Sequence, residues 1–319
     1  VPLVIEGLPI LVEASIGVAL APQHATDASG LLQRADVAMY HAKGTGSIHA
    51  IYDPESDPHS PERLALLGEL RQAIEAGELE LHYQPKIELL AGRVVGAEAL
   101  VRWRHPKHGM IPPDHFILIA ERTGLIKPLT RWVLDTALRQ CKAWRSEGGP
   151  ACVAVNLSAR SLYDPQLPTQ IAALLGSCGV PAEALELEIT ESAIIVDPAR
   201  AAETMQRLVG MGVGISIDDF GTGYTSLGAI RKLPAHEIKI DKSFVLGMAG
   251  ARSEEVIARV ILDLGRSLGF KVVAEGVETE AVARRLVELG CDFAQGYLIS
   301  KPLPAAQFAA WFASYRPMF

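Results

Sequence analysis

The sequence predicts an α/β protein whose larger part is a TIM-like (β/α)8 barrel, preceded by a partial α+β segment. Beyond residue 62, strand-like apolar runs alternate with stretches of helical periodicity, the pattern of βα units around a mostly parallel sheet. About eight such strands within roughly 250 residues favour a closed barrel over an open sheet. The first two strands are joined by the short turn 89–93 without a helix, so this pair is predicted to be antiparallel.

The first 47 residues are predicted to form a short unit of their own. A strand-like apolar run covers residues 9–20, and a helical pattern follows over 28–43. A unit this small, with one helix, cannot bury a convincing core alone, so the chain is expected to begin inside a domain. Prolines, glycines, serines and aspartates in 44–61 then predict a linker, which is placed at 48–62.

Residues 63–319 are predicted to form the barrel. Its strands are expected at 79–85, 93–103, 151–157, 184–190, 212–218, 235–241, 271–277 and 291–297. Its helices are expected at 62–76, 114–122, 127–146, 165–176, 198–210, 253–268, 278–289 and 304–315. The regular alternation of the two sets is what a barrel of βα units requires.

The composition favours a folded cytoplasmic domain that does not bind nucleic acid polymers. Of 319 residues, 49% are hydrophobic and 21% charged, enough for a large core and too few charges for a disordered chain. The formal net charge is 30 − 37 = −7, whereas nucleic-acid binding needs a basic face. No apolar run approaches the ~18 residues of a membrane span. Without CxxC spacing, the four cysteines are interpreted as reduced thiols: Cys141, Cys152, Cys178 and Cys291.

Polar side chains stand at the ends of six successive predicted strands. They are Asn156, Glu188, Asp218 with Asp219, Lys239, Glu275 and Gln295. Taken singly, such a residue is more often a helix cap or a solvated loop residue. Together they are expected to meet at the carboxyl end of the barrel, where barrel active sites lie, and like charges converging there would need a cation.

That cation is expected to be a hard divalent ion. The side chains at the strand ends, together with Glu98, offer mainly oxygen, which selects Mg²⁺, Mn²⁺ or Ca²⁺ over zinc. The histidines do not follow the strand ends, and His105 and His108 are predicted to be surface residues of a turn. Asp218 and Asp219 either include a ligand shared between two ions or include a cap for the following loop; spacing alone leaves both open.

Lys239 ends an apolar strand and has two possible roles. It is either a lysine that extends to solvent at the barrel rim or, among carboxylates, a group that holds a water or neutralises an oxyanion. The stretch DDFGTGY (218–224) follows a strand but lacks the glycine spacing of a nucleotide loop. It is interpreted as a mobile loop over the site.

A series of short motifs runs from residue 83 to residue 304: YQP (83–85), EALVRW (98–103), VNLS (155–158), EITES (188–192), DDFGTGYTSL (218–227), KIDKSF (239–244), AEGVET (274–279) and QGYLISKPLP (295–304). This series resembles the EAL domain, a phosphodiesterase of the bacterial second messenger cyclic di-GMP, and the resemblance covers residues 64–319. It implies metal-dependent hydrolysis of cyclic di-GMP to linear pGpG at the barrel mouth. The cofactor implied is Mg²⁺ or Mn²⁺ in a two-metal site.

The resemblance also implies a role for individual residues. The metal ligands would be Glu98, Asn156, Glu188, Asp218, Asp219 and Glu275. Lys239 would position the nucleophilic water, and Glu275 is in addition a candidate general base. Glu191 resembles the glutamate that holds the DDFGTGY loop and so couples the site to a dimer partner.

Contacts to guanine and phosphate are implied for six further positions: Gln84, Leu100, Arg102, Glu278, Gln295 and Pro302. Arg102 would hold a phosphate. Leu100 would form a floor for a guanine, be a core leucine, or do both. Thr225 stands where the family usually has serine, a conservative change in a loop.

The front unit resembles the C-terminal part of a GGDEF (diguanylate cyclase) domain. The matching motifs are ASIGVAL (14–20) and ADVAMYHAKGTG (35–46). The expected domains are therefore 1–47 as the end of a GGDEF domain, 48–62 as linker and 63–319 as the EAL barrel. The cyclase signature itself would lie upstream of residue 1.

Two other functions remain open at this point. One is a catalytically silent cyclic di-GMP receptor that passes the signal to a partner. The other is a Mg²⁺-dependent barrel lyase acting on a small oxyacid, with Lys239 as acid or base. Intact metal ligands favour the hydrolase over the receptor. The resemblance further implies a homodimer through the helices and loop after Asp218. A cytoplasmic location is expected, including as the cytoplasmic part of a larger membrane-anchored protein.

Overall fold

A computed structural model describes residues 3–5, 8–10, 14–44, 47–54, 61–223, 227–248 and 252–317. The chain divides into two compact units, residues 1–72 with 114–119 and residues 73–113 with 120–319. The division falls inside one continuous helix, α2 (Pro61–Ala76), whereas the sequence placed it at 62/63. Across the described ranges, no helix combines the length and apolarity that a membrane crossing needs.

Before α2, the described residues of the front unit form two small sheets and one long helix. Strands β1 (Leu3–Ile5) and β2 (Leu8–Ile10) pair antiparallel, and β3 (Ile16–Val18) pairs in parallel with β4 (His49–Ile51). Helix α1 (Ala28–Gly44) packs against both β3 and β4. β4 lies inside the stretch predicted as linker, because a strand of three residues carries too little periodicity to be recognised.

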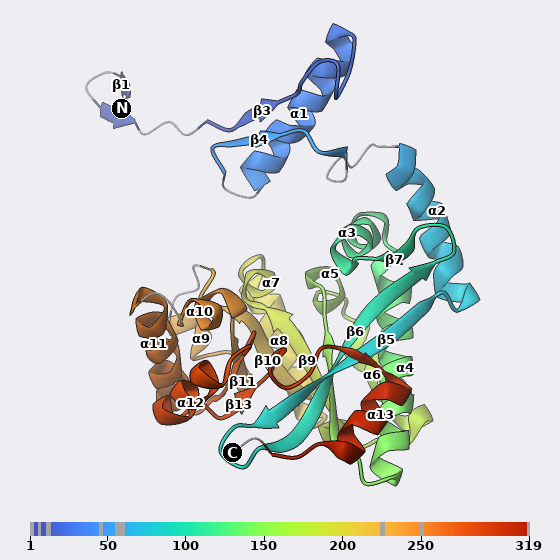
Figure 1. The fold of residues 1–319 in the computed structure, drawn as a ribbon, viewed down its shortest axis with the longest axis vertical. Helices are drawn as coiled ribbons and strands as arrows, with labels where there is room; N and C mark the ends of the chain where they lie inside the picture. Colours follow the sequence, from blue (N-terminus) through green and yellow to red (C-terminus); the bar gives the residue numbers. More distant parts are fainter. Residues whose placement is uncertain are drawn as a thin grey trace. The chain divides into compact units, whose positions relative to one another are not determined.

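Eight strands of the second unit close into a barrel, which confirms the predicted fold class (Figure 1). In spatial order they are β5 (Leu79–Glu88), β6 (Arg93–His105), β8 (Cys152–Asn156), β9 (Leu185–Thr190), β10 (Gly214–Phe220), β11 (Glu237–Ile240), β12 (Lys271–Ala274) and β13 (Phe293–Ala294). The predicted antiparallel first pair is also confirmed, since Gln84 of β5 faces Glu98 of β6 in an antiparallel register. β5 is antiparallel to β13 as well, so it alone runs against the other strands of the closed barrel.

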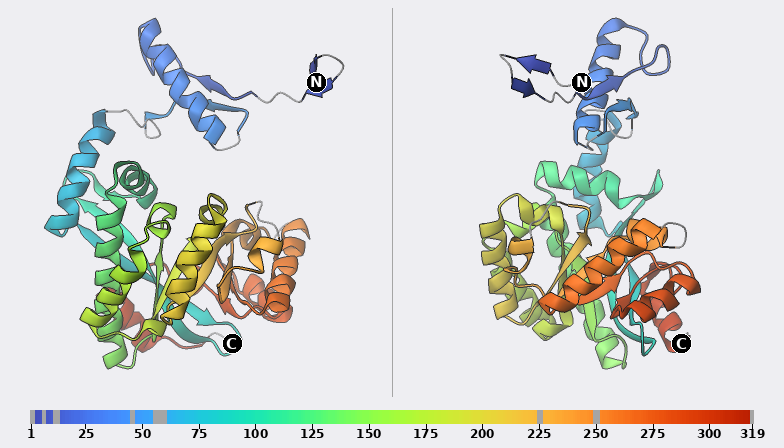
Figure 2. Two further views of the ribbon diagram at one scale, coloured as in Figure 1. Left: turned by 180° about the vertical axis from the view of Figure 1, so that it is seen from behind. Right: turned by 90° about the vertical axis from the view of Figure 1, so that its left-hand side faces the viewer.

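Long helices lie outside the strands, as Figure 2 shows from two further directions. They are α4 (Ile126–Ser146), α6 (Leu167–Cys178), α8 (Pro198–Gly210), α11 (Arg252–Leu268), α12 (Glu280–Leu289) and α13 (Ala305–Ser314). α3 (Pro113–Thr123) also agrees with its predicted range. The short elements were not predicted: β7 (Gly109–Ile111), β14 (Leu303–Pro304), α5 (Ala159–Leu162), η2 (Ala182–Ala184), α7 (Glu191–Ile195), α9 (Leu227–Ile230) and α10 (Lys242–Gly247).

Alternation along the barrel strands directs apolar and charged side chains to opposite faces. In β9, Leu185, Leu187 and Ile189 are buried, and Glu186 and Glu188 between them are buried too. Successive strand residues point to opposite sides of a sheet, so the leucines pack toward the outer helices and the glutamates point into the barrel. The interior of this barrel therefore carries charge where most barrels carry branched apolar side chains.

The four cysteines are free, as the sequence predicted. The prediction for the turn histidines was wrong in one case, because His105 is buried at 3% exposure and only His108 is exposed. The His105 Nδ1 accepts hydrogen bonds from the backbone N–H groups of Lys107 and His108. His105 thus ties the turn together from inside, a use of histidine that a single sequence does not distinguish from an exposed one.

Candidate active site

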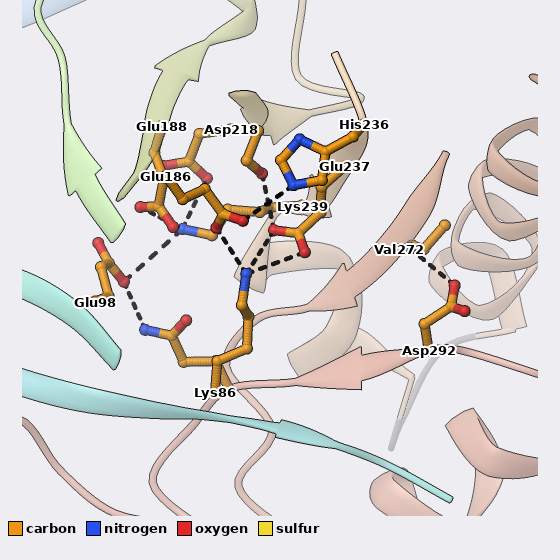
Figure 3. A network of polar contacts seen from close by, with 12 residues as sticks. Lys86, Glu98, Glu186, Glu188, Asp218, His236, Glu237, Lys239, Val272 and Asp292 are labelled. Carbon is orange, nitrogen blue, oxygen red and sulfur yellow. Dashed lines mark hydrogen bonds and ion pairs between the residues drawn. The ribbon is translucent and has the colours of Figure 1, made fainter. Parts of the chain in front are cut away.

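Four carboxylates surround one buried lysine at the carboxyl ends of the barrel strands. Lys239 is completely buried, and its Nζ lies 2.6 Å from Glu275 Oε1, 2.9 Å from Glu188 Oε2, 3.4 Å from Asp218 Oδ1 and 3.8 Å from Glu98 Oε2. The sequence left open whether Lys239 extends to solvent at the rim. Its burial shows that it belongs to the interior cluster, which Figure 3 shows from close by.

Glu98 is held from the other side by amide groups. Asn156 Nδ2 donates to Glu98 Oε1 at 2.6 Å, and Gln295 Nε2 donates to Glu98 Oε2 at 2.5 Å. Gln295 also donates to Gln84 Oε1 at 3.0 Å, and Gln84 donates to the carbonyl of Ser300 at 3.1 Å. The chain of contacts joins β5, β6, β8 and β13, so residues more than 200 positions apart fix one carboxylate.

Burial and mutual repulsion set the ionisation of the cluster. Burial raises the pKa of Glu275 to about 7 against the opposing pull of Lys239. Burial and the neighbouring Glu98 charge raise the pKa of Glu188. Glu98 would also be raised by burial, but Lys239 and the amides of Asn156 and Gln295 hold its pKa below the usual value. The carboxylates hold the pKa of Lys239 above its usual value despite burial, so the lysine stays charged.

Residues of this cluster could hold a divalent cation. Asp218, Asp219 and Glu275 each offer a carboxylate oxygen, and these three oxygens lie within 4.8 Å of one another. Apart from the Lys239 ammonium at 2.9 Å, the buried Oε2 of Glu188 has no hydrogen-bond donor among the described residues, and the oxygen of the Gln295 amide has none there. All of these potential ligand atoms are oxygens, which fits a hard cation such as Mg²⁺ or Mn²⁺.

The two adjacent aspartates are arranged differently from each other. Asp218 is the last residue of β10 that pairs with β9, and its Oδ1 accepts the backbone N–H of Asp219 at 2.9 Å. Asp219 has φ of 52°, a left-handed conformation that is uncommon outside glycine. This turn brings the two consecutive carboxylates to the same cluster, although strand alternation would direct them to opposite faces.

A cavity of about 410 Å³ opens beside the cluster. All six residues predicted to contact substrate line it: Gln84, Leu100, Arg102, Glu278, Gln295 and Pro302. Glu98 and Glu275 form part of the same wall, so the carboxylate cluster and the cavity are continuous. Leu100 is half-buried and faces the cavity, which places it on the pocket wall rather than in the closed core.

The cavity also contains residues that the sequence did not single out, among them Lys242, Leu246 and Tyr297. Lys242 begins α10 directly after β11, so its position in KIDKSF, three residues beyond Lys239, was the available signal. Gly276 allows α10 to approach, because it has φ of 67° and a Cβ there would lie 2.8 Å from the Lys242 Cβ. Two cationic side chains thus line the pocket, Lys242 from α10 and Arg102 from β6.

Glu191 contacts the loop that follows β10. It is buried at 4% exposure as the first residue of α7, and its Oε2 accepts the N–H groups of Gly221 at 3.1 Å and Gly223 at 3.3 Å. The remainder of the motif, Tyr224, Thr225 and Ser226, lies outside the described residues. The contact shows how a glutamate can anchor the part of this loop next to Asp218 and Asp219.

Fold and site together define a barrel protein with an acidic, oxygen-lined site at the carboxyl ends of its strands, where barrel enzymes place their catalytic groups. The chain belongs to the EAL domain family, which matches residues 67–302. The MucR protein of Pseudomonas aeruginosa, a bifunctional diguanylate cyclase/cyclic di-GMP phosphodiesterase, is 44% identical over 304 residues, which are 94% of this chain and 44% of MucR. The cyclic di-GMP phosphodiesterase PdeR of Escherichia coli is 38% identical over 310 residues, 97% of this chain and 47% of PdeR.

The same relationship is visible in solved structures. The PaMucR phosphodiesterase in complex with c-di-GMP has a TM-score of 0.74 at 46% identity and covers 76% of this chain and 99% of its own. The EAL enzyme Bd1971, with cAMP and cyclic di-GMP bound, has a TM-score of 0.75 at 28% identity and covers 91% and 77%. This chain spans less than half the length of MucR and of PdeR.

Proposed function

We propose that this chain hydrolyses cyclic di-GMP to linear pGpG in a reaction that depends on divalent metal ions. The observation that carries the proposal is the buried Lys239 among four carboxylates, at the edge of a cavity lined by all six predicted substrate residues. MucR and PdeR, named as cyclic di-GMP phosphodiesterases, provide independent support.

The residues that would hold two cations are Glu98, Asn156, Glu188, Asp218, Asp219 and Glu275. Bound Mg²⁺ or Mn²⁺ would screen the charge of a phosphodiester and lower the pKa of a water molecule. Lys239 would orient that water by donating from its ammonium. Glu275 would accept the proton, a role that suits a carboxyl whose pKa is about 7.

The cavity would bind the substrate through charge and apolar contact. Cyclic di-GMP carries two phosphates, and a chain with net charge −7 needs local cations to bind a dianion. Arg102 and Lys242 are placed for this, since both line the cavity. Leu100 and Pro302 offer apolar surface to a guanine, and Glu278 and Gln295 offer hydrogen-bond acceptors to its edge.

The test is turnover of cyclic di-GMP followed by chromatography with Mg²⁺, with Mn²⁺ and with chelator. We expect pGpG only with metal, and its loss in Glu98→Ala. Binding of cyclic di-GMP without turnover under every condition would make the chain a receptor. Absence of binding would contradict the proposal and favour a barrel enzyme with another substrate.

We also propose that the barrel forms a homodimer through α10 and α11, the helices after Asp218. Large apolar side chains are exposed there: Leu246 at 44%, Val256 at 57%, Ile257 at 38% and Val260 at 60%. Glu191, which anchors the loop after β10, would couple dimerisation to the active site. Light scattering should show a dimer that Val260→Glu dissociates, whereas Leu90→Glu on the β5–β6 turn, exposed at 80%, should leave it intact. A monomeric wild-type protein would contradict this arrangement.

For the front unit we propose the C-terminal part of a GGDEF domain, residues 1–47 extended by β4 (His49–Ile51), which pairs with β3, followed by a connection up to residue 62. The parallel β3–β4 pair against α1 is compatible with an α+β domain. The match to MucR, whose name includes a diguanylate cyclase, extends over 94% of this chain and thus beyond the EAL region.

A further inference from the structure

A second buried charge cluster lies inside the barrel, below the active-site cluster. The Nζ of Lys86 lies 2.6 Å from Glu186 Oε1 and 2.9 Å from Glu237 Oε1. The three residues are 7%, 5% and 2% exposed. Figure 3 shows this cluster beside the one around Lys239. Lys86 is not among the described residues that line the cavity, so the proposed chemistry gives it no direct role.

The strands relate the two clusters residue by residue. Glu186 precedes Glu188 by two positions on β9, and Glu237 precedes Lys239 by two positions on β11. Side chains two positions apart on a strand share a face and lie about 6–7 Å apart along it. Lys86 follows Gln84 by two positions on the antiparallel strand β5, so it too lies one level toward the amino ends of the parallel strands. The interior thus has an upper layer around Lys239 and a lower layer around Lys86.

Hydrogen-bond donors surround the carboxylates of the lower layer. Ser216 Oγ donates to Glu237 Oε1 at 3.1 Å, the same oxygen that faces Lys86. The backbone N–H of Ile215 donates to His236 Nδ1 at 3.0 Å, so the proton of the neutral ring is on Nε2, which lies 3.2 Å from Glu186 Oε2. The upper layer differs, because Glu188 Oε2 lies 2.9 Å from the Lys239 ammonium but receives no hydrogen bond from a serine, a histidine or the backbone of the described residues.

We propose that Lys86 is a positioning residue, whose ammonium offsets part of the charge of Glu186 and Glu237 and thereby keeps the Lys239 ammonium in the upper layer. Without Lys86, two buried carboxylates one layer down would attract the nearest cation, and on β11 that cation is Lys239. A Lys239 drawn toward the lower layer would leave Glu275 and Asp218 and could no longer orient a water for them. The inference rests on the proposed function, since it concerns the lysine of that site.

A set of charge-matched variants separates positioning from packing. Lys86→Met leaves two buried carboxylates without a cation, and these would draw Lys239 down. The double variant Glu186→Gln/Glu237→Gln leaves Lys86 as a buried cation without carboxylates, which repels Lys239 and competes with it for the carboxylates of the upper layer. Each is expected to lower kcat about 10-fold or more with KM changed less than about 3-fold, because a transition-state group is displaced. The triple variant with all three substitutions has a neutral lower layer, and its kcat should return to within about 3-fold of wild type.

The Mn²⁺ affinity of the protein without nucleotide gives a readout that does not need turnover. Lys239 competes with a metal ion for Glu188 and Asp218, so its withdrawal in Lys86→Met should tighten Mn²⁺ binding several-fold at the wild-type number of bound ions, measured by calorimetry. Ions bound beyond that number would report the lower layer instead, where Glu186, His236 and Glu237 offer ligand atoms within 4.8 Å of one another. General loosening of the site would weaken binding instead. Lys271→Met, at an exposed lysine of the same end of the barrel, is the matched control and should change neither kcat nor Mn²⁺ affinity.

The outcomes decide the proposal separately from the function. A wild-type chain that does not hydrolyse cyclic di-GMP contradicts the proposed function, and the Mn²⁺ comparison then still tests Lys86. If Lys86→Met does not fold, the double and triple variants carry the same comparison. A triple variant that is no more active than the double variant, or Mn²⁺ binding weakened in Lys86→Met, would overturn the proposal.

Discussion

Lys239 and Lys86 are buried among carboxylates in the same barrel, yet their surroundings differ in one respect. Around Lys86, each of the two carboxylates has a second neighbour that can donate, Ser216 or His236, and the lysine and both carboxylates are buried. Around Lys239, four carboxylates share one ammonium, and the cluster borders a cavity. Charge left in excess at an accessible end is what a metal ion and an anionic substrate can use, whereas the buried charges below it, with their additional hydrogen bonds, support the arrangement.

The largest effect is expected from Lys239→Met. The variant removes the ammonium that would orient the attacking water, so pGpG formation should fall about 10²–10³-fold, the usual consequence of losing one electrostatic group in a site. Binding of cyclic di-GMP should persist, because Arg102 and Lys242 remain in the cavity. Chromatographic turnover and a binding titration measure the two quantities. A kcat equal to that of wild type in this variant would show that Lys239 takes no part in the chemistry. The two buried lysines would then not differ in function.

A smaller effect is expected from Gly223→Ala, which tests how the loop is anchored beside the upper cluster. A Cβ at Gly223 would lie 2.7 Å from the carboxyl carbon of Glu191, so Glu191 must shift and its bonds to the loop amides weaken. We expect kcat to fall about 10-fold, because a small displacement near the chemistry is costly.

Gly228→Ala is the matched control for that variant. Gly228 lies a few residues further on, in α9, and nothing lies within 4 Å of its added Cβ. Alanine in a helix is favoured over glycine by up to about 1 kcal/mol, so this change should leave kcat unchanged and stability equal or higher. Equal kcat in both variants would show that the Glu191 contact does not influence the site.

The two clusters also differ in how far the sequence reveals them. The upper cluster could be predicted, because its residues end successive strands and a closed barrel must bring strand ends together. The lower cluster could not, since Lys86 lies within a strand and Glu186 and Glu237 at strand starts look like solvated charges. Their meeting depends on the shear of the closed barrel, which no local pattern encodes.

The same distinction holds for the fold. Long helices and strands were predicted within a few residues because their periodicity is strong. Short elements that stand outside the regular alternation of strands and helices, such as α10 and β14, carry no measurable period, and α10 is what brings Lys242 to the cavity. His105 was assigned to the surface for a related reason: it packs against Trp103 and accepts the backbone N–H groups of its turn, and no residue pattern distinguishes this buried histidine from an exposed one.

The raised pKa of Glu275 in the upper cluster predicts that the stability of the protein depends on pH. Burial raises the pKa of Glu275 to about 7, so between the ordinary glutamate value and pH 7 the folded protein binds a proton that the unfolded chain has released. Stability in chelator should therefore fall as pH rises through this window and level off above it. Urea unfolding at pH 5.5 and pH 7.5 would measure the difference.

Glu275→Gln isolates the contribution of this group. The amide does not titrate, so the variant should lose part of the pH slope and be more stable than wild type at pH 7.5 in chelator. Metal affinity should show the opposite trend, because a proton must leave Glu275 before a cation binds, and wild-type Mn²⁺ binding should tighten as pH rises through 7. If the unfolding free energy of wild type changes with pH as it does in Glu275→Gln, then Glu275 is already ionised below pH 7 and burial does not raise its pKa.

The smallest effect is expected where a lysine–carboxylate pair of the same barrel is exposed. Lys271 Nζ lies 2.7 Å from Asp292 Oδ1 with 60% of the lysine side chain exposed, and Asp292 also accepts the N–H of Val272 at 3.0 Å. Lys271→Met should cost less than about 1 kcal/mol of unfolding free energy, because water replaces the pair and Asp292 keeps its backbone donor. Lys86→Met should cost about 3–5 kcal/mol, because it leaves buried carboxylates without a cation. Urea unfolding of both variants at pH 7.5 compares one substitution at two depths. Equal losses of unfolding free energy would mean that the buried ion pairs of Lys86 stabilise the fold no more than the exposed pair of Lys271 and Asp292 does.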